Sequence, residues 1–104
     1  MDSSLRALAD STRRHILALV WHEERTAGEI ASEFSMTGPA VSQHLKVLLD
    51  SDLVSLRRLG TRRFYRVNQP AIASLQAELA SFWDSGLSRL KRAAEQKERR
   101  TRRR

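Results

Sequence analysis

Several polar residues near the middle of the chain are of the types that read base pairs in DNA. Ser42 and Gln43 can hydrogen-bond base edges in the major groove, and glutamine suits bidentate bonding to adenine. Lys46 can reach a phosphate group. Residues of the same kinds also cover ordinary solvated helix faces, so this segment alone fits either interpretation.

A second segment concentrates five arginines within ten residues and holds no acid among them. If this segment is a pair of strands, like charges face one another, which is unfavourable without an anion. Charges on a strand edge also prevent aggregation, but one or two residues usually suffice for that. The number therefore favours a track for phosphate groups. The arginines are Arg57, Arg58, Arg62, Arg63 and Arg66.

The small and aromatic residues of this segment fit the same interpretation. Gly60 and Thr61 are small enough to enter the minor groove beside Arg62. Phe64 and Tyr65 alternate in facing, so we expect one of them to pack on the core. Tyr65 could also bond a phosphate.

The charges are unevenly distributed along the chain. Lys and Arg total 19 against 12 Asp and Glu, a formal charge of +7. This balance also suits a basic protein without a polyanionic partner, so the position of the charges must decide. The acids lie outside the two basic segments, and we expect them opposite the basic surface. Six of them are Glu23, Glu24, Glu29 and Glu33, which precede the fourth helix, and Glu78 and Asp84 on the last helix.

Length and composition limit the possible classes of protein. A chain of 104 residues has the size of one domain. It holds no cysteine, which excludes disulfides and thiolate metal sites. No apolar run approaches the ~20 residues that span a bilayer, and the first residues do not resemble a signal peptide. We therefore expect a cytoplasmic protein with no membrane partner and no cofactor.

Apolar spacing and capping residues predict three helices in the first third of the chain. A short helix comes first, Asp10 caps the second, and Thr26 starts the third, with Glu29 placed for a capping box. A tight connection at Ser35-Met36 follows. The apolar residues that define these helices are Leu5 and Leu8; Ile16, Leu17 and Val20; and Ala27, Ile30, Ala31 and Phe34.

A fourth helix is predicted to follow Thr37, which caps it. The third and fourth helices, joined by a short turn, have the helix-turn-helix layout. The buried stripe of the fourth helix is predicted at Val41, Leu45, Leu48 and Leu49. With that stripe turned to the core, the outward residues are Gly38, Pro39, Ser42, Gln43 and Lys46.

The remaining chain predicts a hairpin and one long helix. Residues 53–59 and 62–67 form the hairpin, with its tip near Gly60, and its place directly after the helix-turn-helix makes it a wing. Asn68 or Gln69 caps the last helix. Residues 95–104 hold no apolar side chain, so we expect a basic, disordered tail after a single domain over residues 1–94. The tail either extends a contact with DNA or keeps the chain soluble.

The last helix carries an apolar stripe too long for one small domain to cover. The stripe could pack only on its own domain, but large exposed apolar patches are uncommon on monomers, which favours a second copy. A two-fold dimer would place two fourth helices one DNA turn apart, roughly 34 Å. The stripe consists of Ile72, Leu75, Leu79, Phe82, Trp83, Leu87 and Leu90.

Three segments in register resemble the ArsR-type (arsenical-resistance repressor) family of winged-helix regulators. Residues 8–17, LADSTRRHIL, resemble the family pattern LADPTRRxIL. Residues 39–48, PAVSQHLKVL, match its reading helix, and DLV at 52–54 with GTRRFYRV at 60–67 matches its wing. The resemblance covers residues 5 to about 94.

This resemblance implies a winged helix-turn-helix homodimer that represses transcription at an operator, often that of its own gene. DNA contacts would come from Thr37, Ser42, Gln43 and Lys46, and from Arg58, Arg62 and Arg63 of the wing. The first and last helices would form the dimer through Leu5, Leu8, Leu75, Leu79, Phe82, Trp83, Leu87 and Leu90.

The chain departs from the family at positions that bear on sensing. Thr26 and Gly28 stand where many members have metal-binding cysteines, and no histidine follows His44. Metal sensing at the usual places is therefore not expected. The pair Phe82-Trp83 resembles the branch that does not sense metals, and an unidentified small molecule is the remaining possible inducer. Gly38 stands where the family commonly has a longer polar residue, and Ser11 stands where it usually has a proline.

Two other functions compete with DNA binding. An enzyme needs a nucleophile with a base, a metal site or a phosphate cradle, whereas the three histidines are scattered and the four glycines isolated. We therefore expect no catalysis. A winged helix could also bind RNA or a protein, but RNA readers usually offer aromatic stacking platforms, and only Phe64 and Tyr65 lie near the basic surface.

Overall fold

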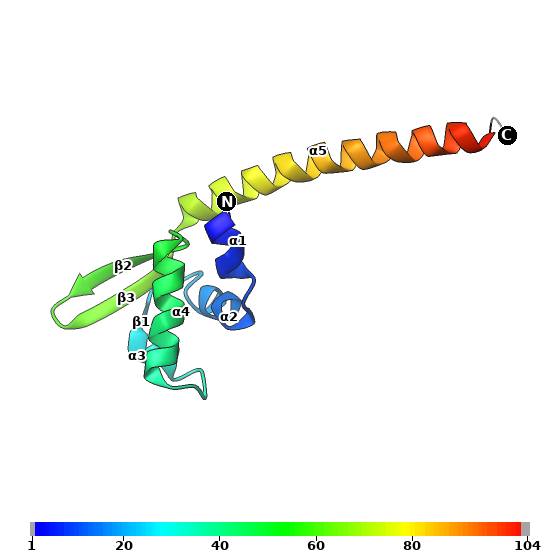
Figure 1. The fold of residues 1–104 in the computed structure, drawn as a ribbon. Helices are drawn as coiled ribbons and strands as arrows, with labels where there is room; N and C mark the ends of the chain where they lie inside the picture. The colour runs from blue at the N-terminus through cyan, green and yellow to red at the C-terminus, as the bar shows by residue number, and fades with distance from the viewer. Residues whose placement is uncertain (1, 103–104) are drawn as a thin grey trace. The chain divides into compact units, whose positions relative to one another are not determined.

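The computed structural model describes residues 2–102, and the surroundings of side chains for residues 2–100. The chain divides into two compact units, Met1–Ala73 and Ser74–Arg104. The elements run in the predicted order, with one short strand in addition (Figure 1). They are α1 (Asp2–Leu8), α2 (Ser11–Leu19), β1 (Arg25–Thr26), α3 (Ala27–Ala31), α4 (Gly38–Asp50), β2 (Val54–Leu59), β3 (Arg62–Val67) and α5 (Gln69–Arg102).

Side-chain caps start α2, α3 and α4 as predicted. Each cap oxygen accepts a bond from the backbone N–H three residues on, which satisfies one of the unpaired donors at a helix start. The hydrogen bond from the Arg13 backbone lowers the pKa of the Asp10 carboxyl below its usual value. The caps are Asp10 to Arg13 (3.1 Å), Thr26 to Glu29 (3.1 Å) and Thr37 to Ala40 (3.3 Å).

The third helix is shorter than predicted. It ends at Ala31, so residues 32–37, not a tight turn at Ser35-Met36, connect it to α4. The Ser32 hydroxyl donates to the Glu29 carbonyl at 2.7 Å, a local bond that competes with continued helix. Phe34 therefore lies beyond α3, where its ring packs edge-on against His15 with centroids 4.9 Å apart.

A regular C-terminal motif ends α4 and directs the chain into the hairpin. The N–H of Leu53 donates to the Leu48 carbonyl and that of Asp52 to the Leu49 carbonyl, both at 3.0 Å. These two bonds define a Schellman motif, whose turning residue takes a left-handed conformation and is usually glycine. Asp52 fills that position with φ of 61°.

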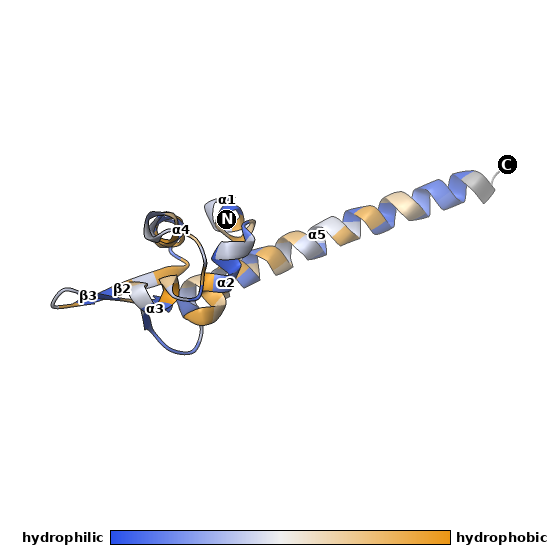
Figure 2. Cartoon of the chain, turned by 90° about the horizontal axis from the view of Figure 1, so that it is seen from below, coloured by the Kyte–Doolittle hydropathy of each residue, from blue (hydrophilic) through white to orange (hydrophobic). Residues whose placement is uncertain are grey.

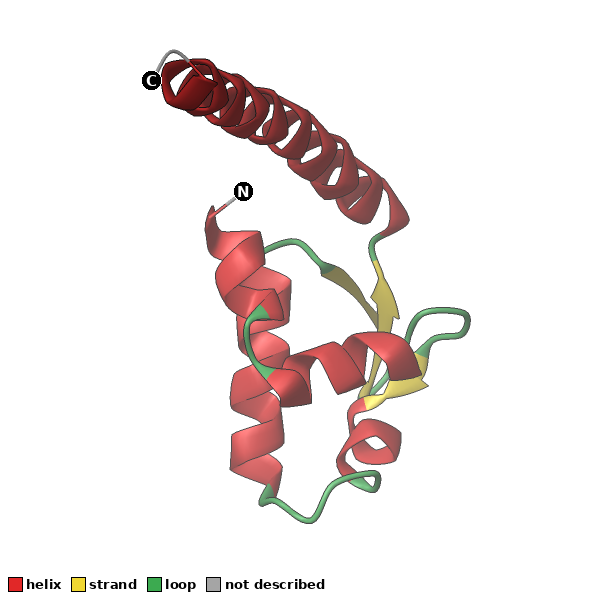
Figure 3. Ribbon diagram, turned by 90° about the vertical axis from the view of Figure 1, so that its right-hand side faces the viewer, coloured by secondary structure: helices red, strands yellow, loops and turns green. Residues whose placement is uncertain are grey.

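The hairpin pairs β2 with β3, and Gly60, with φ of 61°, is the first of the two turn residues that join them. Strand β1 pairs with the other edge of β3, giving the antiparallel order β1-β3-β2. This strand was not predicted, because two residues carry no alternating pattern. The hairpin tip extends beyond the helices of its unit (Figures 1 and 3).

Apolar side chains from helices and sheet form the core of the first unit. The predicted stripe of α4 is confirmed for Val41, Leu45 and Leu48, which are at most 2% exposed, while Leu49 is half-buried. Tyr65 is the hairpin aromatic that packs inward, at 5% exposed. The other buried apolar residues of this unit are Ala7, Ile16, Leu17, Val20, Ile30, Leu53, Val54 and Val67.

The last helix runs without interruption from Gln69 to Arg102. Asn68 caps it, accepting from the Ala71 N–H at 3.3 Å. Figure 2 shows apolar residues along the helix and hydrophilic residues in its last turns. The segment 95–102, expected to be disordered, is thus helical. Its Glu, Gln, Lys and Arg residues are strong helix formers, and adding residues to an existing helix is easier than starting one.

Candidate nucleic-acid interface

The outward face of α4 is a polar surface opposite the buried stripe. Ser42, Gln43 and Lys46 are exposed, as are Thr37, Gly38 and Pro39 at the start of the helix. Positions 39, 42, 43 and 46 lie on one side of a helix with 3.6 residues per turn. The core therefore orients these groups toward solvent, where they could enter a groove of a duplex.

One acid, Asp50, lies beside the outward residues of α4 and pairs with Lys46. Lys46 Nζ donates to Asp50 Oδ2 at 2.8 Å, one turn further along α4. The hydrogen bond from Lys46 to Asp50 raises the pKa of the lysine. Both side chains are about two-thirds exposed, at 67% and 64%. An incoming phosphate would compete with Asp50 for the ammonium group.

The register of the hairpin places two arginines opposite one another. Arg58 pairs with Arg63 across β2 and β3, and both are exposed. Cross-strand partners share a face of the sheet, so their guanidinium groups repel. In the part of the chain that the structure describes, neither forms an ion pair. A phosphate group between or beside them would relieve this repulsion.

On the opposite face of the hairpin, Glu24 of the same chain neutralises the charge of Arg57. Arg57 forms a bidentate salt bridge with Glu24, with Nε 3.2 Å from Oε2. The guanidinium also lies over the Phe64 ring, 4.6 Å from its centroid. The bond from Arg57 lowers the pKa of Glu24. The acids are therefore not all remote from the basic segments, because Glu24 lies against the hairpin.

The residues of the hairpin tip are exposed, whereas Tyr65, one of the predicted phosphate contacts, is buried. Gly60, Thr61 and Arg62 are exposed, and Arg62 lines a pocket of about 420 Å³ that extends to the start of α3. Tyr65 is buried, because alternation along β3 turns it toward the core. Tyr65, predicted as a possible phosphate contact, is therefore not among the proposed DNA contacts.

The apolar stripe of the last helix is largely uncovered. Leu8 and Leu79 are half-buried, and Leu75 is 6% exposed, so Leu75 has little surface left for a partner. The remaining predicted interface residues are exposed at Leu5 (38%), Phe82 (60%), Trp83 (64%), Leu87 (48%) and Leu90 (67%).

Over the described residues, no three His, Asp or Glu side chains come together as metal ligands. The same residues include no helix that is both long and apolar enough to cross a membrane. His44 contacts Arg13, and His15 contacts Phe34.

Comparison with known proteins gives a consistent result. The sequence model described as "Bacterial regulatory protein, arsR family" matches residues 10–55, which include α2, α3 and α4. The HTH-type transcriptional regulator Rv2034 of Mycobacterium tuberculosis is 42% identical over 87 residues, which are 84% of this chain and 81% of that protein. The transcriptional repressor SdpR of Bacillus subtilis is 31% identical, with 83% and 96% covered.

One solved structure is similar to the chain in both fold and sequence. It is the homodimeric winged helix-turn-helix DNA-binding domain Mb0332 from Mycobacterium bovis, a possible ArsR-family regulator. Its TM-score is 0.65 at 34% identity, with 80% of this chain and 77% of that chain covered. The predicted fold class, a mainly helical winged helix-turn-helix, is confirmed.

Proposed function

Because the chain belongs to the arsR family of bacterial regulatory proteins, whose members are winged helix-turn-helix transcriptional regulators, we propose that it represses transcription as a homodimer on double-stranded DNA. Helix α4 reads the operator sequence, and the β2–β3 hairpin holds the backbone beside it. We place this activity in the cytoplasm, and it requires neither catalysis nor a metal.

The observation that carries this proposal is the pair Arg58 and Arg63, directly opposite on an exposed hairpin. Facing like charges destabilise a sheet unless an anion joins them. The same compact unit presents the uncharged polar groups of Ser42 and Gln43. A protein surface that combines base-reading groups with phosphate-binding arginines suits duplex DNA.

The proposed contacts divide by what they recognise. Ser42 and Gln43 bond base edges in the major groove. The small residues at the start of α4 let the backbone approach closely. Phosphate groups are held by Lys46, after it leaves Asp50, and by the wing arginines. The full proposed set is Thr37, Gly38, Pro39, Ser42, Gln43, Lys46, Arg58, Arg62 and Arg63.

The proposed dimer interface consists of the exposed apolar residues of α1 and α5. Four large side chains, Phe82, Trp83, Leu87 and Leu90, are each between 48% and 67% exposed on one helix. Soluble monomers seldom leave such a patch uncovered. The homodimeric Mycobacterium bovis domain, similar in fold, supports a second copy as the partner.

A footprint of the purified protein on the DNA upstream of its own gene tests the proposal. We expect protection of a two-fold symmetric site whose halves lie about one helical turn apart. Binding to duplex DNA, duplex RNA and single strands is then compared at equal salt. Preference for RNA, or equal affinity for every duplex sequence, would contradict the proposal. Adding candidate small molecules and scoring loss of the footprint tests for an inducer.

A further inference from the structure

The Arg13 side chain joins three helices of the first unit. Arg13 lies in α2, near its capped start. Its Nε donates to the Ala7 carbonyl at 2.7 Å and its Nη2 to the Arg6 carbonyl at 2.9 Å, both near the C-terminal end of α1. Its Nη1 lies 3.3 Å from Nδ1 of His44, in the middle of α4. One guanidinium thus connects α2 with both α1 and α4.

The chemistry of the groups fixes the direction of the bond to α4. Arginine offers only donors, so in this bond Nδ1 of His44 is the acceptor. Asp10 faces the same ring nitrogen at 4.0 Å, from the junction of α1 and α2. The His44 side chain is 21% exposed, so surrounding residues largely enclose it.

We infer that Arg13 is a positioning residue for DNA reading, which holds α4 in its orientation against α1 through His44. The inference rests on the proposed function, because that function assigns the contact with bases to α4. His44 directly follows Gln43, so a rotation of α4 that breaks the bond to Arg13 also moves the groups that read bases. Segment 10–13, which is not among the proposed DNA contacts, thereby has a role in orienting α4.

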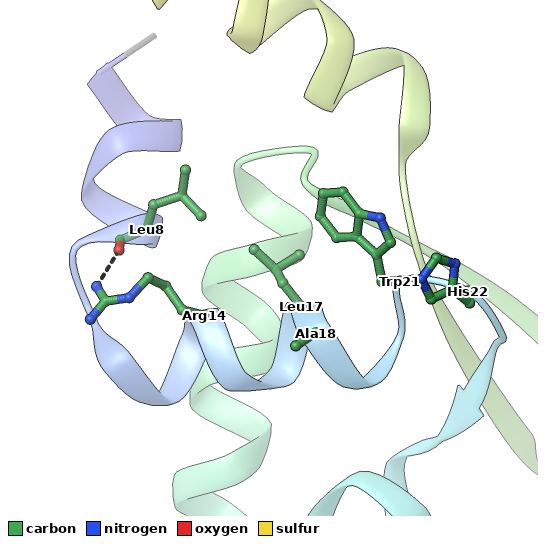
Figure 4. A pocket seen from close by; sticks show the side chains of 6 residues that line it. All are labelled: Leu8, Arg14, Leu17, Ala18, Trp21 and His22. Atoms are coloured by element: carbon green, nitrogen blue, oxygen red, sulfur yellow. Dashed lines mark hydrogen bonds between the residues drawn. The ribbon is translucent and has the colours of Figure 1, made fainter.

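The neighbouring Arg14 provides a matched control. Its Nη1 donates to the Leu8 carbonyl at 2.7 Å (Figure 4), so it also connects α2 with the end of α1. It makes no bond to α4 in the part of the chain that the structure describes. If Arg13 acts only by fastening α1 to α2, removing either arginine should have the same consequence for DNA binding.

A double-mutant cycle tests the link. The variants Arg13→Ala, His44→Ala and the double change are titrated against the footprinted operator by fluorescence anisotropy. We expect each single change to weaken binding about tenfold and the double change to weaken it no further, as coupled residues do. His44→Asn, whose Oδ1 can accept near the position of Nδ1, and Arg14→Ala should remain within about twofold of the parent.

Two controls separate positioning from other roles. Thermal unfolding and light scattering establish that each variant is folded and dimeric at the titration temperature. The slope of log affinity against log salt should not change in Arg13→Ala, because a positioning residue neutralises no phosphate. If Arg13→Ala does not fold, the comparison of His44→Ala with His44→Asn decides the question alone.

Several outcomes would overturn the inference. They are unchanged affinity in His44→Ala, additive losses in the double variant, equal losses in Arg14→Ala and Arg13→Ala, or a salt slope lower by about one in Arg13→Ala. Failure of the unaltered protein to bind any duplex would instead remove the proposed function. The two failures are therefore distinguishable.

Discussion

The two faces of the β2–β3 hairpin carry the same residue type in opposite states. On one face, Arg57 is held by Glu24 and stacked on Phe64. On the other, Arg58 and Arg63 face one another without an acid. The first arrangement stabilises the sheet in the isolated chain, whereas the second requires an anion from outside. A group without a partner in its own chain thus indicates where another molecule binds.

The same contrast separates two apolar residues of α5. Leu75 is 6% exposed, and Trp83, two turns further on, is 64% exposed. The first needs nothing more, whereas the second needs a partner to leave water. On the two faces of the hairpin and along the apolar stripe of α5, substitutions that remove the uncompensated groups should therefore affect binding, and substitutions that remove the compensated groups should affect stability. The following predictions test that distinction, beginning with the largest expected effect.

Trp83→Asp should convert the protein to monomers. A carboxylate at the centre of an apolar interface would be buried without a partner, a cost of several kcal/mol. Light scattering at micromolar concentration measures the mass. Ser81→Asp is the control, because it adds the same charge on the opposite side of the helix. An unchanged mass in Trp83→Asp would refute the interface on α5.

Replacing both Arg58 and Arg63 by alanine should weaken binding to every duplex by on the order of 100-fold, since each charge-assisted bond contributes about 1.5 kcal/mol or more. The salt slope should fall by about two, one for each lost phosphate contact. Titrations at several salt concentrations measure both. Arg57→Ala is the control and should leave the slope unchanged. Equal slope changes in the two variants would erase the distinction between the faces.

Asp50→Asn should strengthen DNA binding. The change releases Lys46 from its hydrogen bond, so the ammonium group no longer has to be taken from a carboxylate. An exposed pair of this spacing contributes little to stability, and removing a negative charge near phosphate adds to the gain, so we expect roughly a threefold effect. Titration of Asp50→Asn beside Asp50→Glu, which keeps the charge, isolates the cause. Weaker binding in Asp50→Asn would contradict it.

The ion pair of Glu24 and Arg57 predicts a pH dependence of stability. Arg57 lowers the pKa of Glu24 in the folded chain below the ordinary value of 4.5. The pair's contribution is therefore present above pH 4.5 and is lost as pH falls through the lowered pKa. Chemical denaturation of Glu24→Gln and the parent should differ at pH 7 and converge in acid. A difference that grows on acidification would contradict this account.

Features that depend on neighbours in sequence were predictable. Asp10, Thr26 and Thr37 cap helices as expected, because a cap needs only a backbone N–H three residues away. The buried stripe of α4 follows from helical periodicity. The ion pair of Lys46 and Asp50 was not predicted, although its spacing of four residues is the signal of such pairs on helices.

Features that depend on distant segments could not be read in advance. Glu24 meets Arg57 only because β1 joins the sheet, and a two-residue strand has no pattern of its own. The bond from Arg13 to His44 spans 31 residues and requires the packing of α2 beside α4. Burial of Tyr65 rather than Phe64 followed from the register of the hairpin, which alternation alone leaves open.

The central claim is that the outward face of α4 reads base sequence. Selection of bound duplexes from a random pool, sequenced for the parent and for the variant Ser42→Ala with Gln43→Ala, tests it most directly. We predict a defined half-site for the parent and a flattened preference for the variant, with the salt slope retained because the arginines remain. An unaltered sequence preference in that variant would contradict the account.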